Sequence, residues 1–188
     1  LKPGDVRLVD KNGDGIIDDN DKFAFHSDIP KFIYSWNVNL DYKGFDLNMM
    51  FQGTSGGLKY FYGEWVEGPS YQVFTGKHFL DRWTPENENG NAKIPRLESA
   101  NNRNQNPNNS FFLKSTSYLR LKNVQLGYTI PKTITQKWGV DKLRVYLAGS
   151  NLLTFSNLYQ GMDPEVGSGR PNTFPPLKII NFGVNLVF

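Results

Sequence analysis

Apolar and polar residues alternate with a period of two in five segments of this chain. Alternation of this kind is typical of β-strands whose two faces meet different surroundings. The segments expected as strands are 32–42, 45–53, 118–130, 141–151 and 177–188. In the first of them the apolar positions are Tyr34, Trp36, Val38, Leu40 and Tyr42, and Ser, Asn and Asp occupy the positions between. The pattern predicts an all-β fold.

The connections between these segments alternate between short and long. Lys43-Gly44 predicts a tight hairpin after the first strand, and 131–140 is a short connection with room for one helical turn. The segments 54–117 and 152–176 are long, polar and rich in Asn, Gly and Pro. Short periplasmic turns that alternate with long extracellular loops are typical of outer-membrane barrels. The alternation changes phase near Lys122, which predicts a β-bulge or the point where the strand leaves the membrane.

Composition is compatible with an outer-membrane barrel and argues against several other classes of protein. The mean hydropathy is −0.50, and no run approaches the ~18 apolar residues of a membrane-spanning helix. These values do not exclude a membrane barrel, because only every second residue of a barrel strand faces lipid. The net charge of +3 without a basic run gives no sign of a nucleic-acid partner. The absence of cysteine excludes disulfides and cysteine-based metal or redox sites.

A soluble sandwich or barrel would also alternate, and two features favour the membrane. The polar positions of the first hairpin are mostly Asn, Ser and Gln, as in a wet lumen, and aromatic residues lie near strand ends. Apolar residues recur at every second position from Ile180 to a terminal Phe188, a pattern that resembles an outer-membrane assembly signal. The alternation of short and long connections predicts that the last strand runs inward and ends in the periplasm. Residues 1–4 show neither an initiator Met nor a signal peptide, so we expect a longer precursor.

The segment 10–21 reads DKNGDGIIDDND and matches the spacing of an EF-hand calcium loop. Calcium takes six to eight oxygen ligands, and this spacing places oxygens around one point, with Gly15 at the sharp bend. The expected metal ligands are Asp10, Asn12, Asp14, Ile16 through its carbonyl, Asp18 and Asp21. The Ile16 side chain is expected to pack beneath the loop. The predicted role is structural, within an extracellular segment 1–31.

This loop departs from an EF-hand in two ways. Its last position is Asp21 rather than Glu, so a bidentate contact is harder to reach and magnesium is an alternative ion. The flanking residues read as extended rather than helical. The competing interpretation is a solvated turn rich in Asp and Asn.

Other chemistry is sparse in this sequence. His26 and His78 lack ligand spacing, and no serine lies in a nucleophile elbow, so we expect no enzyme activity. Aromatic side chains in the long loop could stack on a sugar or peptide, or could instead pin the loop to its neighbours. The candidates for substrate binding are Trp65, Tyr71 and Trp83.

Several blocks together resemble one known family. These blocks are PGD at 3–5, the loop 10–21, PKF at 30–32, YKGFDL at 42–47, FQG at 51–53, YLRLKNV at 118–124, LGY at 126–128, LRVY at 143–146, NL at 151–152 and FGVN at 182–185. In this combination and order they resemble the C-terminal barrel portion of the SusC/RagA group of TonB-linked outer-membrane proteins. The resemblance covers nearly the whole chain.

The resemblance implies a 22-stranded plugged barrel, of which this chain would supply the last five strands. It also implies import of glycans or peptides with a SusD-like surface lipoprotein, energised by TonB, ExbB and ExbD through an N-terminal part of the protein. The rest of the barrel is a required partner, because open strand edges in lipid leave backbone groups unpaired. Two alternatives stay open: a secreted calcium-dependent β-sandwich for binding or adhesion, and a simple porin.

Overall fold

The computed structural model describes residues 1–23, 27–61, 77–87, 92–97, 109–159, 161–165 and 174–188. The chain divides into two compact units. The sheet unit comprises Lys31–Ser55, Ser117–Asn157 and Pro176–Phe188. The loop unit comprises Leu1–Pro30, Gly56–Thr116 and Leu158–Pro175. No helix in the described part of the chain is both long and apolar enough to cross a membrane.

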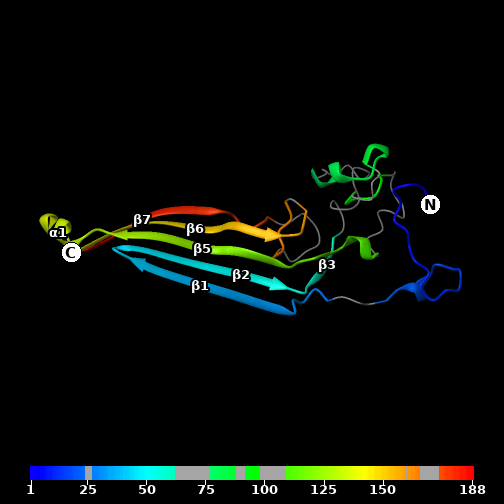
Figure 1. The fold of residues 1–188 in the computed structure, drawn as a ribbon, viewed down its shortest axis with the longest axis horizontal. Coiled ribbons are helices and arrows are strands. Elements are labelled where there is room, and N and C mark those ends of the chain that lie inside the picture. Colours follow the sequence, from blue (N-terminus) through cyan, green and yellow to red (C-terminus); the bar gives the residue numbers. More distant parts are fainter. Residues whose placement is uncertain (24–26, 62–76, 88–91, 98–108, 160, 166–173) are drawn as a thin grey trace. The chain divides into compact units, whose positions relative to one another are not determined.

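The sheet unit is one antiparallel sheet of five strands in the order β1-β2-β5-β6-β7 (Figure 1). The strands are β1 (Phe32–Tyr42), β2 (Phe45–Ser55), β5 (Tyr118–Thr129), β6 (Lys142–Ser156) and β7 (Ile179–Val187). Each expected strand segment corresponds to one of them. The main difference is at β6, which runs five residues beyond 151 and takes 152–156 out of the expected loop 152–176.

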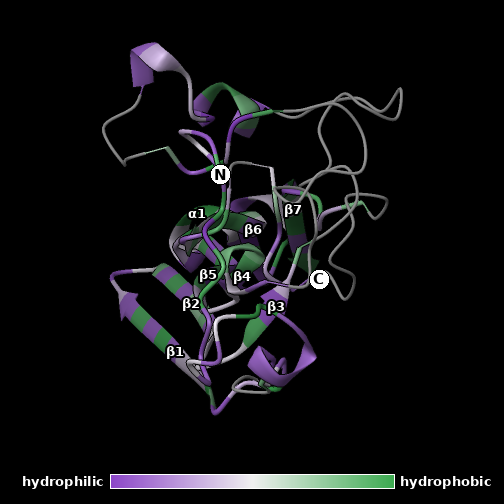
Figure 2. Ribbon diagram, turned by 90° about the vertical axis from the view of Figure 1, so that its right-hand side faces the viewer, coloured by the Kyte–Doolittle hydropathy of each residue, from purple (hydrophilic) through white to green (hydrophobic). Residues whose placement is uncertain are grey.

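The register places the alternating apolar residues of all five strands on one face. One row across the sheet is Leu40, Leu47, Leu126, Leu147 and Phe182. Their side chains are not packed into a closed interior: Leu40 is 57% exposed, Leu126 49%, Leu147 53% and Phe182 72%. Figure 2 shows the alternation as green and purple bands along β1. A continuous apolar face left open is what a lipid-facing barrel wall requires.

The opposite face of the sheet is polar and rich in amides. The row next to the leucine row runs through Asn39, Asn48, Gln125, Ala148 and Asn181. Uncharged hydrogen-bonding side chains suit the wet interior of a barrel, where they are satisfied by water or by neighbouring polar groups. The two faces therefore meet two different solvents.

The expected phase change in β5 is a β-bulge. The pairing of β5 with both neighbours shifts between Leu121 and Asn123, so Lys122 is out of register. On β6 the matching irregularity contains Asn151, whose φ of 55° lies in the left-handed region that Asn tolerates better than most residues. The bulge keeps apolar residues on the same face on both sides of the shift.

Two glycines receive the rings of tyrosines on neighbouring strands. A Cβ at Gly183 on β7 would collide with the ring of Tyr146, its partner on β6. A Cβ at Gly53 on β2 would meet the ring of Tyr34, its partner on β1. In each pair the missing side chain is replaced by an aromatic ring that covers the exposed backbone.

The connection between β5 and β6 contains α1 (Lys132–Thr135) and the 3-10 turn η8 (Gln136–Trp138). The turn η8 ends at Gly139, whose φ of 67° fits a residue without a Cβ. Thr135 and Val140 are buried, and α1 contacts β6. The expected helical turn in this connection is therefore present.

The loop unit contains more regular structure than a long loop was expected to have. Strands β3 (Leu58–Tyr60) and β4 (Leu113–Ser115) pair antiparallel within the segment 54–117. Short 3-10 helices in its described residues are η1 (Asp19–Asp21), η4 (Lys77–Asp81), η5 (Pro85–Asn87) and η7 (Ser110–Phe112). Phe61 and Phe112 form a small buried core beside β3 and β4, with Phe111, Leu158 and Met162 packed against it.

Candidate functional site

The aspartate loop, residues 10–21, is built around the side chain of Asp10. Its two carboxylate oxygens accept hydrogen bonds from the backbone N–H of Gly13 at 2.7 Å and of Gly15 at 2.8 Å. Gly13 and Gly15 have φ values of 79° and 85°, which other residues rarely adopt. Asp14 accepts from the N–H of Ile16 at 2.8 Å. The sequence thus folds this segment into a tight wrap with its oxygens turned toward the loop's own backbone.

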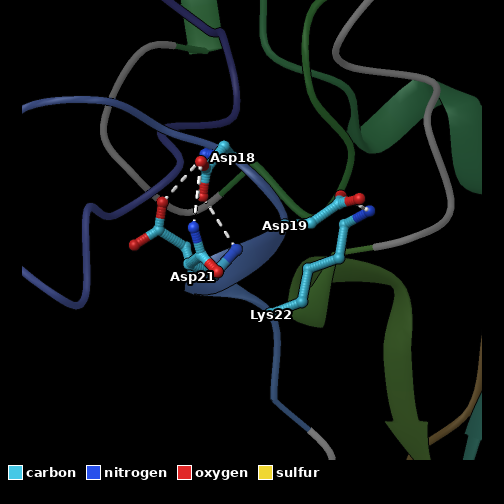
Figure 3. A network of polar contacts seen from close by, with 5 residues as sticks. Asp18, Asp19, Asp21 and Lys22 are labelled. Atoms are coloured by element: carbon cyan, nitrogen blue, oxygen red, sulfur yellow. Dashed lines mark hydrogen bonds and ion pairs between the residues drawn. The ribbon is translucent and has the colours of Figure 1, made fainter.

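Asp21 closes the loop by joining its two ends. Its carboxylate accepts from the backbone N–H of Lys11 at 2.7 Å and of Asp18 at 3.0 Å. These hydrogen bonds, with Lys11 the largest contributor, lower the pKa of Asp21 from its ordinary value. Figure 3 shows these contacts at the start of η1: the N–H of Asp18 donates to the Asp21 carboxylate, and the Asp18 carboxylate accepts from the N–H of Asn20. Beside them, Lys22 pairs with Asp19.

The chemistry of this loop fits a hard cation, and its present geometry is held by hydrogen bonds. Carboxylate and amide oxygens with a backbone carbonyl form the donor set that calcium prefers. Each carboxylate oxygen has two lone pairs, so an oxygen bonded to an N–H keeps capacity for a metal. Within the described ranges, however, no three His, Cys, Asp or Glu side chains converge as a ready-made metal cluster. Calcium or magnesium binding therefore stays a prediction.

The Ile16 side chain differs from the expectation. It is 64% exposed rather than packed beneath the loop. The reason is local: the loop is closed by hydrogen bonds to Asp10 and Asp21, and the described residues on either side of it form no helix that could supply an apolar floor.

Of the three aromatic candidates for substrate binding, Trp65 and Tyr71 lie outside the described residues. Trp83 is half-buried, and its ring lies against Gly4, where an added Cβ would be 2.5 Å from Cδ2 of the indole. Its backbone N–H donates to the carbonyl of Ile94 at 2.8 Å. One face of Trp83 therefore packs within the loop unit, which supports the pinning interpretation for that face.

A cavity of about 990 Å³ brings Trp83 and the aspartate loop to one place in the loop unit. Its walls include Trp83, Tyr60 and Phe111, together with Lys11 and Asp21 of the loop. Sequence spacing gave no sign of this meeting, because the segments are far apart along the chain. Part of its aromatic surface is already covered, since Lys11 Nζ lies 3.3 Å from the centroid of the Phe23 ring, another wall residue.

An ion pair that the sequence did not indicate holds the N-terminal segment in place. Arg96 Nε donates to the carboxylate of Asp5 at 2.5 Å, and both side chains are largely buried. The backbone N–H of Arg96 also donates to the carbonyl of Gly4 at 3.0 Å. The PGD block at 3–5 was singled out for its resemblance alone, and here Gly4 and Asp5 have a structural role.

A cluster of polar side chains surrounds Tyr159, which is half-buried. Its hydroxyl donates to the carbonyl of Lys93 at 2.9 Å, and His78 stacks on its ring with centroids 5.2 Å apart. Burial raises the pKa of Tyr159 to about 12. Burial also lowers the pKa of Lys114, whose ammonium lies 5.6 Å from the Tyr159 ring centroid. These groups stabilise the loop unit and show no nucleophile–base arrangement.

On the polar face of the sheet, Arg144 on β6 pairs with Asp46 on β2 across Gly127 of β5. Arg144 Nε donates to Asp46 Oδ1 at 2.9 Å, and a second contact joins Nη2 to Oδ2. A Cβ at Gly127 would meet both side chains. The guanidinium also lies over the ring of Tyr146, 5.0 Å from its centroid. This group ties three neighbouring strands together on the face opposite the apolar one.

Comparisons with known proteins agree with this architecture. TonB-dependent receptor P26 of Formosa agariphila is 32% identical over 98% of this chain and 20% of the receptor. TonB-dependent receptor P3 of the same organism is 30% identical over 99% of the chain and 19% of the receptor. SusC of Bacteroides thetaiotaomicron is 28% identical over 100% of the chain and 18% of SusC. No protein-family model matches the sequence.

Solved structures give the same result. The RagAB peptide importer in its open-open state matches with a TM-score of 0.66 and 27% identity, over 87% of this chain and 18% of that chain. The RagAB peptide transporter matches with a TM-score of 0.65 and 26% identity, over 92% and 20%. This chain spans about a fifth of the length of these relatives.

An outer-membrane β-barrel of the TonB-dependent type is the class that this sheet and these relatives define, and the chain forms part of a larger barrel of that type. Within the class, the sequence and the fold fit the SusC/RagA family of TonB-dependent receptors.

Proposed function

We propose that this chain is part of the wall of an outer-membrane importer that takes up oligomeric nutrients, glycans or peptides, in a TonB-dependent manner. The observation that carries the proposal is the division of the sheet into an exposed apolar face and an amide-rich face. A wall between hydrocarbon and a water-filled passage needs this division. The relatives are named as receptors and importers, which supports transport and gives no support to an enzyme.

The proposed partners follow from the same framework. The outer edges of β1 and β7 have no partner within the five-stranded sheet, so further strands of the same barrel would pair with them. A SusD-like surface lipoprotein is the proposed second component, on the family likeness. We assign coupling to TonB, ExbB and ExbD to other regions of the full-length receptor. The relatives of this chain are about five times as long as the chain itself. We place the C-terminus in the periplasm and the loop unit outside the cell.

The aspartate loop is proposed to bind calcium, with magnesium as the alternative ion. Asp10, Asn12, Asp14, Asp18 and Asp21 would supply side-chain oxygens and Ile16 its carbonyl. The support is the donor set and the wrap that Gly13 and Gly15 permit. A bound ion would stiffen an exposed loop by linking carboxylates that now accept hydrogen bonds from backbone N–H groups and from the side-chain amides of Asn12 and Asn20. For substrate contact, Trp83, Trp65 and Tyr71 stay candidates.

Two alternatives receive less support. A β-sandwich module would bury the apolar face against a second sheet, but four residues of that face in one row, Leu40, Leu126, Leu147 and Phe182, are 49–72% exposed. A simple porin would not explain the likeness to TonB-dependent receptors along nearly the whole chain.

The test is uptake in cells that lack the gene. We expect the deletion to abolish uptake of at least one class of labelled oligomer, glycan or peptide, while uptake of the corresponding monomer is unchanged. A wild-type copy should restore uptake, and dissipating the proton-motive force should remove it again. Unchanged uptake of a full panel of both oligomer classes would contradict the proposal. Co-purification of a lipoprotein with the tagged full-length receptor tests the partner separately.

A further inference from the structure

The connection between β5 and β6 carries an exposed apolar pair that a simple turn does not need. Ile134 and Trp138 are 44% and 62% exposed and lie four positions apart in a continuous helical run, α1 followed by η8. The run is held in place by two buried residues, since Thr135 is fully buried and Val140 nearly so. The pair is thus presented outward on a fixed support.

Both strands that this connection joins already have a paired neighbour on each side. β5 and β6 are interior strands of the sheet, with β2 and β7 paired on their outer sides. At the same end, the Asp141 N–H donates to the carbonyl of Val187 at 2.8 Å, which anchors the connection to β7. Figure 1 shows α1 beside the C-terminal end of β7 and at the β1–β2 turn end of the sheet. Completion of the barrel by further strands would therefore leave Trp138 without a neighbouring strand to cover it.

The charge and the neighbours of the pair indicate a lipid surface. The segment 131–142 contains three lysines, Lys132, Lys137 and Lys142, and a single acidic residue, Asp141, which pairs with Lys132 at 3.4 Å. The apolar face runs directly into it, through the row Tyr42, Phe45, Tyr128, Val145 and Val184, whose Phe45 and Tyr128 rings are 4.5 Å apart. Aromatic residues with lysines beside them are the groups that lie at the headgroup level of a bilayer.

We propose that the 131–142 connection is a membrane-interface anchor, in which Ile134 and Trp138 enter the headgroup region of a phospholipid leaflet and Lys137 contacts a lipid phosphate. The inference rests on the barrel fold and not on transport. It assigns a lipid-binding role to a connection that the sequence suggested only as a turn. The anchor would fix the height of the barrel in the bilayer at this end.

The test uses single-cysteine labelling, for which a chain without cysteine is convenient. The full-length receptor with Trp138→Cys, in a background free of other reactive cysteines, is labelled with a small fluorophore. It is then reconstituted in vesicles of phosphatidylethanolamine and phosphatidylglycerol. Quenching is measured with aqueous iodide and with lipids that carry a nitroxide in the headgroup region or deep in the acyl chain. Leu147→Cys on the lipid-facing row and Glu86→Cys on an exposed 3-10 turn serve as references.

At position 138 we expect strong quenching by the headgroup nitroxide, and iodide quenching several-fold weaker than at position 86. The label at 147 should respond best to the deep nitroxide. Iodide access at 138 equal to that at 86 would overturn the proposal. Shielding from both iodide and lipid nitroxides would also overturn it, because a protein surface would then cover the pair. Heat-modifiable gel mobility confirms that each variant forms the barrel before the label is read.

Discussion

Arg144 and Asp46 lie on strands that do not touch, and their side chains meet over Gly127 of the strand between them. The residues are 98 positions apart in the chain. A two-point contact between guanidinium and carboxylate has fixed geometry and joins β2, β5 and β6 on the polar face. Such a contact resists sliding of one hairpin along the other.

The first prediction concerns this pair. Arg144→Gln should lower the free energy of unfolding of the full barrel by about 1–3 kcal/mol, because a partly buried carboxylate loses a charged hydrogen-bond partner. Urea unfolding in lipid or detergent, followed by tryptophan fluorescence, measures the change. The companion variant Asp46→Asn and the double variant complete a cycle. Strictly additive effects of the two substitutions would show that the pair contributes no coupling.

The second prediction tests the two faces of the sheet with neighbouring residues. Leu147→Arg places a charge on the lipid-facing row and should cost about 2–4 kcal/mol near the bilayer midplane. The matched control Ala148→Arg, one residue along the same strand, points to the polar face and should be much better tolerated. The fraction of heat-modifiable barrel in outer-membrane preparations is the measurement. Equal losses for both variants would contradict the assignment of faces.

The third prediction concerns the aspartate loop and calcium. Asp14→Ala should weaken calcium binding by about tenfold or more, because it removes one ligand from the proposed set. Asp19→Ala is the matched control, since Asp19 pairs with Lys22 and lies outside that set. Calorimetric titration of the full-length receptor measures the affinity. A wild-type receptor that shows no calcium response, or equal responses from both variants, would remove the metal from the proposal.

The fourth prediction is a loss of loop order in acid. The pKa of Asp21 in the folded loop is below its ordinary value of 3.8, chiefly because the Lys11 N–H donates to its carboxylate. A lowered folded pKa stabilises the loop above pH 3.8 and ceases to do so as pH falls through the folded value. Amide hydrogen exchange at Lys11 and Asp18 should therefore rise steeply below about pH 4 relative to the intrinsic rate. In Asp21→Asn the same amides should lack this step.

The sequence predicted the sheet well because period-two patterning is a local signal. Both the strands and the apolar face follow from it, and the phase change near Lys122 correctly indicated the bulge. The end of β6 was missed because Asn151 and Leu152 interrupt the alternation at the irregularity, so that 152–156 resembled loop. Pattern reasoning has no means to continue a strand across such a break.

The contacts of the loop unit were not predictable in the same way. Asp5 with Arg96 and Gly4 with Trp83 join segments about 80 to 90 residues apart, and no periodicity links them. The β3–β4 pair was missed because three-residue strands are too short to show alternation. The aspartate loop was identified from spacing alone, which reports ligand chemistry but not whether oxygens converge.

The ring of Tyr146 lies on Gly183 and thereby fixes the register between β6 and β7. If β7 joined two residues out of place, that ring would meet Asn181 or Asn185, which have side chains where Gly183 has none. The stagger between successive strands, summed around a closed barrel, determines the barrel's width and the tilt of its strands. A side chain at position 183 would therefore disturb the stagger between β6 and β7 and, through it, the width of the barrel.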